Sequence, residues 1–374
     1  MNHTKIYVAS AGTGKTTTLM DLLSKCLETS KPKEIAFTTF TKAGAQEAIE
    51  RALIKNTSCK LSDLEGFSTL HALCYRRVPR KPMLTSHDYK ELGQLIDIPM
   101  TGNVRHGNDG FIYNNSVGNQ MLYLDSLMRN LLISSEEVIR EQINCRINKQ
   151  TLQEFHENYR AYRQKINKYD FTDQLETFVS QNEEYNFKYV FVDEAQDLSP
   201  LQWKAIKCIT KNSETVFVAG DDKQSIYKFA GGDPKSLINM KGERIVLDTS
   251  YRLPENVLNY AESIAENIEE KQDYTVKPIN NGGVVQKIHS LSELDMSQGT
   301  WFLLCRNKIY MPYYEDALMK KKTLFVSSSG DSMFNQKQID YILLWEQLRR
   351  GYKFKGAKIK ELYREFLPTG RVLA

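Results

Sequence analysis

Residues 5–17 read KIYVASAGTGKTT, an apolar strand-like run followed by a glycine-containing loop and the start of a helix. A phosphate-binding loop requires this order, because its backbone N–H groups and the helix N-terminus then face the phosphate oxygens. The usual pattern begins with glycine where this chain has Ala9, but Gly12 and Gly14 still allow a tight loop. The alternative, a chance glycine-rich turn, is disfavoured by the order of strand, loop, GKT and helix. The predicted nucleotide contacts are Ala11, Gly12, Thr13, Gly14, Lys15, Thr16 and Thr17.

A second apolar run ends in residues suited to hold magnesium and water. Residues 189–197 read YVFVDEAQD, so a buried strand would deliver carboxylates at its C-terminal end, where ligands bind in open α/β sheets. Lys15 would reach the β- and γ-phosphates, while the Thr16 hydroxyl and Asp193 would hold Mg²⁺. Glu194 can orient and deprotonate the water that attacks the γ-phosphate. A solvated acidic strand end is the better interpretation of this segment alone, but not beside a phosphate-binding loop.

Two further segments place polar side chains just after strand-like runs. Residues 217–227 read FVAGDDKQSIY, and Gln224 in this loop can sense a γ-phosphate by hydrogen bonding. Residues 248–252 read DTSYR, which joins a ring that can stack on a base, Tyr251, to a guanidinium suited to phosphate, Arg252. A purely structural role is an equally good interpretation of either segment taken alone.

Strand-like and helix-like patterns alternate along most of the chain, which indicates a mostly parallel α/β sheet. The strand-like runs are residues 5–9, 35–40, 189–192, 215–219, 244–247, 301–305 and 323–326. Amphipathic helical patterns cover residues 17–27, 43–54, 200–209 and 255–268. Residues 75–168 break the alternation, since they hold helical patterns without a convincing strand series. We interpret this stretch as a helical insertion within the first α/β domain.

The composition excludes several classes of protein. Apolar residues make up 41% and charged residues 26% of the 374, which excludes disorder throughout the chain. No apolar run approaches the ~20 residues of a membrane helix, and we expect no signal peptide. The six cysteines form no CxxC pair, which favours reduced thiols in a cytoplasmic protein. The formal charge of +4 is weak support for nucleic-acid binding, since basic clusters such as residues 76–81 are equally compatible with solvated faces.

Together the four motif segments resemble the UvrD/Rep/PcrA group of superfamily 1 DNA helicases, where GTGKT, VDEAQD, GDDKQSIY and TSYR elements occur in this order. Residues 39–47 are similar to the family's motif Ia, residues 68–73 to its Thr-x-His element and residues 169–175 to its DFxDL segment. Residues 301–306 and 329–338 are similar to early parts of the second motor domain. The resemblance extends, with gaps, from residue 5 to about residue 350.

The resemblance implies two RecA-like P-loop motor domains, with ATP between them and single-stranded DNA running across both. It implies that Arg252 contacts the γ-phosphate and that Tyr251 stacks on adenine. An aromatic ring that stacks on a base tolerates any sequence, as a motor requires. Ordinary core packing is the alternative for each of the predicted DNA-binding residues, which are Phe40, Thr41, Thr69, His71 and Phe229.

The expected domain division follows the same resemblance. Residues 1–74 and 169–250 would form the first RecA-like domain around the insertion at 75–168. Residues 251–350 would form part of the second RecA-like domain, and residues 351–374 the start of a second insertion or a truncated tail.

The chain departs from the family pattern in three respects. An upstream glutamine segment that recognises adenine is absent, and Lys228-Phe229-Ala230 replaces a Gly-Trp-Arg run. Neither motif V nor the arginine-rich motif VI, which carries the arginine finger, is found after residue 340. We therefore expect an incomplete second motor domain, in a fragment or in a chain that a partner protein completes.

The leading hypothesis is an ATP- and Mg²⁺-dependent DNA helicase or translocase that acts on single-stranded DNA with the family's 3′ to 5′ polarity. The alternatives are a non-unwinding ATPase subunit of a helicase–nuclease or repair complex, and a nucleotide-dependent DNA-binding fragment. The expected location is the interior of a bacterial or phage-infected cell, with no membrane partner. DNA repair, replication, recombination and phage defence all remain open as pathways.

Overall fold

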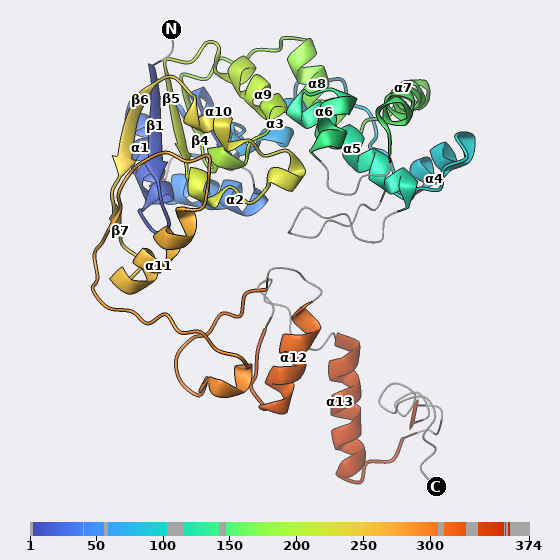
Figure 1. The fold of residues 1–374 in the computed structure, drawn as a ribbon, viewed down its shortest axis with the longest axis vertical. Coiled ribbons are helices and arrows are strands. Elements are labelled where there is room, and N and C mark those ends of the chain that lie inside the picture. The colour runs from blue at the N-terminus through green and yellow to red at the C-terminus, as the bar shows by residue number, and fades with distance from the viewer. Residues whose placement is uncertain are drawn as a thin grey trace. The chain divides into compact units, whose positions relative to one another are not determined.

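The computed structural model describes residues 3–39, 41–55, 59–102, 116–141, 147–305, 310–326 and 336–354, together with residues 356, 358 and 359. These residues belong to two compact units, residues 1–286 and residues 287–374 (Figure 1). Among the helices described, none combines the length and the apolar composition that crossing a bilayer would need.

A six-stranded parallel sheet lies at the centre of the first unit and confirms the expected α/β class. The strand order is β3-β2-β4-β5-β1-β6, and each pair of neighbours is parallel. Such a sheet needs crossover connections that place helices on its faces, as a RecA-like domain has. The strands are β1 (His3–Ala9), β2 (Ile35–Thr39), β3 (Phe67–Thr69), β4 (Tyr189–Val192), β5 (Thr215–Gly220) and β6 (Glu243–Leu247).

Helices cover both faces of the sheet, because successive strand residues point to opposite sides. On one face, the rings of Phe37, Phe191 and Phe217 stack in a row across three strands and form one core with the first two helices. On the other face, Ile6 and Val190 belong to a second core with four helices. The helices of the first face are α1 (Lys15–Thr29) and α2 (Lys42–Lys55), and those of the second are α3 (Leu70–Tyr75), α8 (Phe171–Ser180), α9 (Pro200–Thr210) and α10 (Pro234–Ile238).

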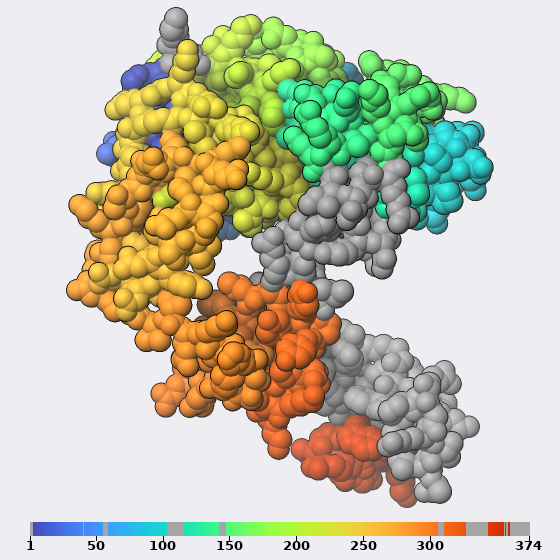
Figure 2. All heavy atoms as spheres, viewed as in Figure 1, coloured from blue at the N-terminus to red at the C-terminus, as the bar shows by residue number. Residues whose placement is uncertain are grey.

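The chain between α3 and α8 forms a helical layer with a core of its own. Its entry and exit lie side by side, since Leu84 N donates to Tyr169 O and Tyr169 N donates to Pro82 O, both at 2.9 Å. In the space-filling view this layer, cyan to green, lies against the lime-green surface of α8 and α9 (Figure 2). Its helices are α4 (Ser86–Leu95), α5 (Val117–Leu131), α6 (Ser135–Arg140) and α7 (Lys149–Ile166).

A buried ionic cluster joins this helical layer to α8. The guanidinium of Arg129 on α5 lies 2.7 Å from carboxylate oxygens of Asp170, Asp173 and Glu176. Arg163 on α7 adds a contact from its Nε to Asp173 at 2.9 Å. Because buried charges are tolerated only when they are paired, these contacts fix how the layer meets the sheet-bearing part of the unit.

The rest of the first unit begins with a short parallel pair, β7 (Thr249–Ser250) and β8 (Lys277–Pro278), and α11 (Glu255–Ala265). In the second unit the named elements of the described residues are η6 (Leu291–Glu293), α12 (Met311–Lys320) and α13 (Gln336–Arg349). No strand forms at residues 301–305, where one was expected, or at residues 323–325 of the strand expected at 323–326. Apolar composition alone makes no strand, because the backbone also needs a neighbouring strand with which to pair. Phe302, Leu304 and Leu324 are exposed.

Candidate nucleotide and nucleic-acid site

The loop between β1 and α1 has the tight conformation that its two glycines predict. Gly12 and Gly14 have φ values of +74° and +78°, which L side chains rarely adopt. A Cβ on Gly12 would also lie 2.5 Å from the Cβ of Arg252, so no other residue fits there without a shift. Thr13 Oγ1 donates to Ser10 O at 2.9 Å and closes the loop.

The predicted phosphate, metal and catalytic residues converge at the carboxyl ends of β1 and β4. Lys15 Nζ forms an ion pair with Glu194 Oε2. Thr16 Oγ1 lies 3.4 Å from Asp193 Oδ2. A hydroxyl and a carboxylate at one place are the oxygen donors that Mg²⁺ prefers, so these residues fit that ion. Thr17 lies one position further along α1.

Carboxyl groups crowd this end of the sheet. Burial raises the pKa of Asp193 to about 6 and that of Asp197 to about 7, and the charge of Glu194 contributes to both shifts. Burial likewise raises the pKa of Asp221 to about 6. Burial would also raise the pKa of Glu194, but the charge of Lys15 and hydrogen bonds from Gln196 and Lys15 hold it below its ordinary value. The negative charge that these carboxyl groups can carry is therefore larger than the single positive charge of Lys15. This excess favours the binding of a further cation.

Gln196 connects two of the predicted segments, a role that sequence reasoning missed. Its side chain is 3% exposed, and its Nε2 donates to Glu194 Oε2 at 2.9 Å and to Asp197 Oδ2 at 3.2 Å. Its Oε1 accepts from Asp221 N at 3.0 Å, in the loop after β5. In that loop Gln224 Nε2 donates to Asp221 Oδ2 at 2.6 Å. The sequence places Gln196 in the DEAQD run, but the contacts across to the next strand have no local pattern.

The segment after β6 lies directly on the phosphate-binding loop. Ser250 Oγ donates to Ala11 O at 2.8 Å, and Tyr251 N donates to Gly12 O at 2.9 Å. The Tyr251 side chain is 63% exposed, so one face of its ring is free to stack on a base. Arg252 is exposed beside Gly12. The structure thus brings both predicted residues of this segment to the loop.

The predicted DNA residues are only partly brought together. Thr41 Oγ1 accepts from Gly44 N and Thr69 Oγ1 accepts from Ala72 N, so each caps a helix start. Burial lowers the pKa of His71, which favours a neutral imidazole. Phe40 lies outside the described residues.

Phe229 belongs to an aromatic cleft that also contains a residue missed from the sequence. Phe171 is 71% exposed at the start of α8, and its ring meets that of His71 edge-on with centroids 6.3 Å apart. Tyr123 of the helical layer donates its hydroxyl to Phe229 O at 3.0 Å. Phe171 lies in the segment that is similar to the family's DFxDL element, but only the fold shows that its apolar side chain is exposed to solvent. The cleft has a volume of about 230 Å³, and its aromatic lining is Tyr89, Tyr123, Tyr159, Phe171 and Phe229.

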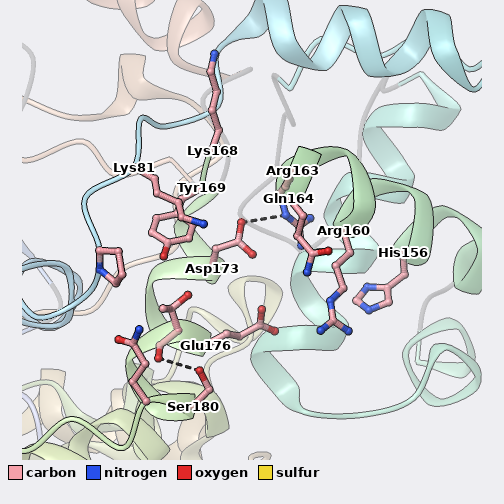
Figure 3. Close-up of a pocket in the computed structure, with 13 residues that line it drawn as sticks. Lys81, His156, Arg160, Arg163, Gln164, Lys168, Tyr169, Asp173, Glu176 and Ser180 are labelled. Carbon is pink, nitrogen blue, oxygen red and sulfur yellow. Dashed lines mark hydrogen bonds and ion pairs between the residues drawn. The ribbon is translucent and has the colours of Figure 1, made fainter. Parts of the chain in front are cut away.

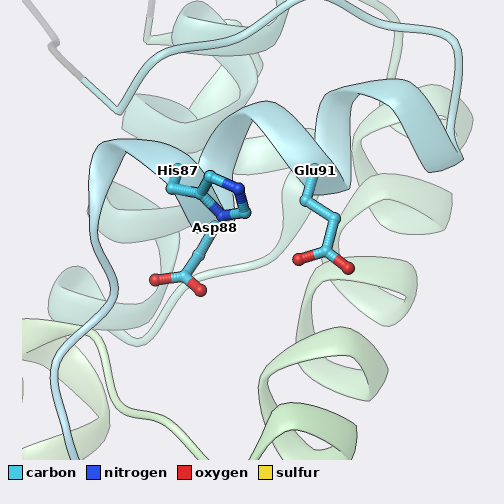
Figure 4. Close-up of side chains that lie close together, drawn as sticks. All are labelled: His87, Asp88 and Glu91. Carbon is cyan, nitrogen blue, oxygen red and sulfur yellow. The ribbon is translucent and has the colours of Figure 1, made fainter.

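Two other groupings of charged side chains lie in the first unit, one between the helical layer and α8 and the other on α4 within the layer. A cleft of about 530 Å³ lies between α7 and α8, where Arg163 and Asp173 point toward one another (Figure 3). His87, Asp88 and Glu91 offer ligand atoms within 4.8 Å of one another on α4 (Figure 4). Asp88, however, is paired with Lys168 at 2.7 Å, and Glu91 accepts from Tyr162 at 2.9 Å. Asp88, Glu91, Arg163 and Asp173 thus all have partners within the fold.

The parallel sheet and its glycine loop place the chain among P-loop α/β proteins. Within that class, residues 1–244 match the UvrD/REP helicase N-terminal domain, and the chain belongs to the UvrD/Rep helicase family. The match confirms the resemblance read from the motifs.

Two curated helicases are similar to this chain along most of its length. The ATP-dependent DNA helicase PcrA of Staphylococcus epidermidis is 22% identical over 380 residues, which cover 90% of this chain and 50% of that protein. PcrA of Staphylococcus aureus is 22% identical over 386 residues, which cover 96% of this chain and 50% of that protein. The chain therefore spans about half the length of the curated relatives it matches.

Proposed function

We propose that this chain binds MgATP at the loop between β1 and α1 and acts as the motor of a DNA helicase or translocase on single-stranded DNA, with 3′ to 5′ polarity. The observation that carries the proposal is the pairing of Lys15 with Glu194 beside the Thr16–Asp193 contact. A lysine that is held beside a glycine loop by the acid after β4 is preorganised to exchange that acid for a phosphate.

Each of these residues would have a separate role in ATP hydrolysis. Backbone N–H groups of the loop would cradle the phosphates. Thr16 and Asp193 would hold Mg²⁺, which would supply positive charge to the phosphate oxygens. Once Lys15 turns to the phosphates, Glu194 loses its partner and is available to orient the attacking water. Gln196 keeps the Glu194 carboxylate in place through its 2.9 Å hydrogen bond. Tyr251 stacks on the base, and Arg252 and Gln224 contact the γ-phosphate.

Calorimetric titration with MgATP tests the nucleotide site. Lys15→Ala should weaken binding at least about tenfold, because charge-assisted bonds to phosphate are lost. Lys25→Ala, on the exposed side of the same helix, is the matched control and should bind as the unaltered protein does. Equal affinities for Lys15→Ala and Lys25→Ala would refute the assignment.

For DNA, the proposal rests on the aromatic cleft at Phe171 and Phe229. Alanine at either position should weaken binding to single strands by about 1–3 kcal/mol, the loss of one stacked base. The salt dependence should stay the same, because no phosphate contact is removed. Fluorescence anisotropy with a labelled oligonucleotide at several salt concentrations measures both quantities, and Leu95→Ala, an exposed apolar residue on α4, is the control. Unchanged affinity in both phenylalanine variants would contradict the proposal.

A nucleotide-dependent DNA-binding role without rapid turnover is the second candidate. It is favoured because, among the residues described, Arg252 is the one arginine whose contacts place it at the phosphate-binding loop. An arginine finger contributes about 10³–10⁵-fold to related reactions. We expect residues 1–374 alone to bind ATP but to hydrolyse it slowly, with little stimulation by single-stranded DNA and no unwinding. Robust DNA-stimulated hydrolysis in a steady-state assay would exclude this candidate and favour the motor.

A further inference from the structure

Carbonyl groups of the phosphate-binding loop accept hydrogen bonds from the chain after β6, and one of the donors, Tyr274, lies outside the four motif segments. Tyr274 donates its hydroxyl to Ala9 O at 2.9 Å, at the point where β1 passes into the loop. Ser250 and Tyr251 bind the carbonyls of Ala11 and Gly12. The backbone N–H groups of such a loop face phosphate, so its carbonyls must find partners elsewhere. Here the chain after β6 supplies those partners.

The Tyr274 hydroxyl also reaches the loop after β5. It lies 3.4 Å from Asp221 Oδ1, and the other oxygen of that carboxylate accepts from Gln224 Nε2 at 2.6 Å. Asp221 is buried, and its position is fixed further by a bond from Lys223 N at 3.1 Å. One hydroxyl therefore touches both the phosphate-binding loop and the carboxylate that holds Gln224.

Neighbouring contacts hold the Tyr274 ring in place. Lys223 Nζ lies over the ring, 4.3 Å from its centroid, and forms an ion pair with Glu262 of α11 at 2.6 Å. Two residues before the tyrosine, Gln272 donates its backbone N–H and its side-chain amide to the buried carboxylate of Asp222, at 2.7 Å and 3.0 Å. A ring fixed on two sides presents its hydroxyl at one point, as a positioning group must.

We propose that Tyr274 is a positioning residue for recognition of the γ-phosphate. It anchors Asp221, and Asp221 sets where Gln224 stands relative to the phosphate-binding loop. The inference rests on the proposed nucleotide site and adds a residue to it. Within the loop Tyr274 contacts only Ala9, where β1 ends, whereas Ser250 and Tyr251 hold the carbonyls of Ala11 and Gly12. The α- and β-phosphates should therefore be bound equally well without the Tyr274 hydroxyl.

The test compares the affinities for ADP and for a non-hydrolysable ATP analogue, both with Mg²⁺, by calorimetry. Tyr274→Phe removes the hydroxyl and keeps the ring that packs against Lys223. We expect ADP affinity to stay within about twofold and analogue affinity to fall about two- to tenfold, the effect of one lost hydrogen bond. Tyr260→Phe, the same change at an exposed tyrosine on α11, should alter neither affinity. Thermal unfolding of both variants shows whether the folded state is intact.

The outcomes separate this inference from the function on which it rests. If the unaltered protein binds no nucleotide, or if Lys15→Ala binds as well as it does, the proposed nucleotide site itself fails. The nucleotide site is supported if the unaltered protein binds nucleotide and Lys15→Ala weakens that binding. If Tyr274→Phe then has the same ratio of analogue affinity to ADP affinity as the unaltered protein, Tyr274 is only structural and the inference is wrong. An unaltered protein that does not distinguish the analogue from ADP would also overturn it, because no γ-phosphate contact would exist to be positioned.

Discussion

Replacing Arg129 with methionine should destabilise the first unit by about 3–5 kcal/mol, the usual effect of breaking a buried ion pair from one side. Methionine fills part of the volume but carries no charge, so Asp125, Asp170, Asp173 and Glu176 lose their common partner. Arg163 can compensate for Asp170 and Asp173 only. Against a typical total stability of about 5–15 kcal/mol, this is a large fraction.

The loss of folding stability caused by Arg129→Met should grow as pH rises. Burial and the charge of Asp170 already raise the pKa of Asp173 above its ordinary value. Burial would also raise the pKa of Asp170, but the charges of Arg129 and Arg163 overcome this effect and lower that pKa. Without Arg129 the folded-state pKa of both carboxyls rises. A carboxyl whose pKa is raised by folding costs no stability below its unfolded pKa of about 3.9. The cost grows as pH rises from there to the folded pKa and is constant above it. The variant should therefore be closer to the unaltered protein at pH 5 than at pH 8.

Urea unfolding at the two pH values, followed by the fluorescence of the buried Trp203, measures the difference. Arg160→Met is the matched control, because Arg160 is exposed on α7 and a surface change of this kind usually stays within about 0.5 kcal/mol. A loss below about 1 kcal/mol at pH 8 for Arg129→Met, or a loss that is the same at pH 5, would refute the reasoning.

Three further predictions concern the nucleotide site. In Gly12→Ala, the alanine would need a φ near +74°, which is unfavourable, and its Cβ would collide with Arg252. Calorimetry should therefore show nucleotide affinity reduced at least about tenfold. Glu194→Gln frees Lys15 from its ion pair, so MgATP should bind at least as tightly as before, while single-turnover hydrolysis is lost. Thr16→Val removes the predicted metal hydroxyl, so ATP affinity should become nearly equal with Mg²⁺ and with a chelator.

Much of the sheet could be predicted because its inner strands β2, β4, β5 and β1 are largely buried and read as continuous apolar runs. β1, β2, β4, β5 and β6 were all expected within a few residues of where they lie. β3 was not, since Phe67–Thr69 is too short to show a period. Residues 301–305 have the same apolar character as those strands but find no partner strand among the described residues, so composition misled there.

The site shows a similar division between local and distant information. The glycine loop and the acids after β4 follow from short motifs with a fixed geometry, and sequence was sufficient for them. The contacts of Gln196 with Asp221, and of Tyr274 with Ala9, join positions far apart in the chain. No spacing rule connects such residues, because the order of strands in the sheet, and not their order in the sequence, makes them neighbours.

That strand order accounts for the assembly of the whole site. β4, β5, β1 and β6 are consecutive in the sheet, so the segments after them, with Glu194, Gln224, Lys15 and Tyr251, meet along one carboxyl edge. β2 and β3 lie beyond β4 and lead to the predicted DNA residues Thr41, Thr69 and His71, whereas Phe229 follows β5. β4 lies between β2 and β5 and pairs with both strands. Just after β4, the N–H group of Asp193 donates to the carbonyl of Thr38 in β2 at 2.9 Å. Asp193, a predicted Mg²⁺ ligand, is therefore one hydrogen bond away from the strand that leads to Thr41, a predicted DNA residue, without any intervening helix.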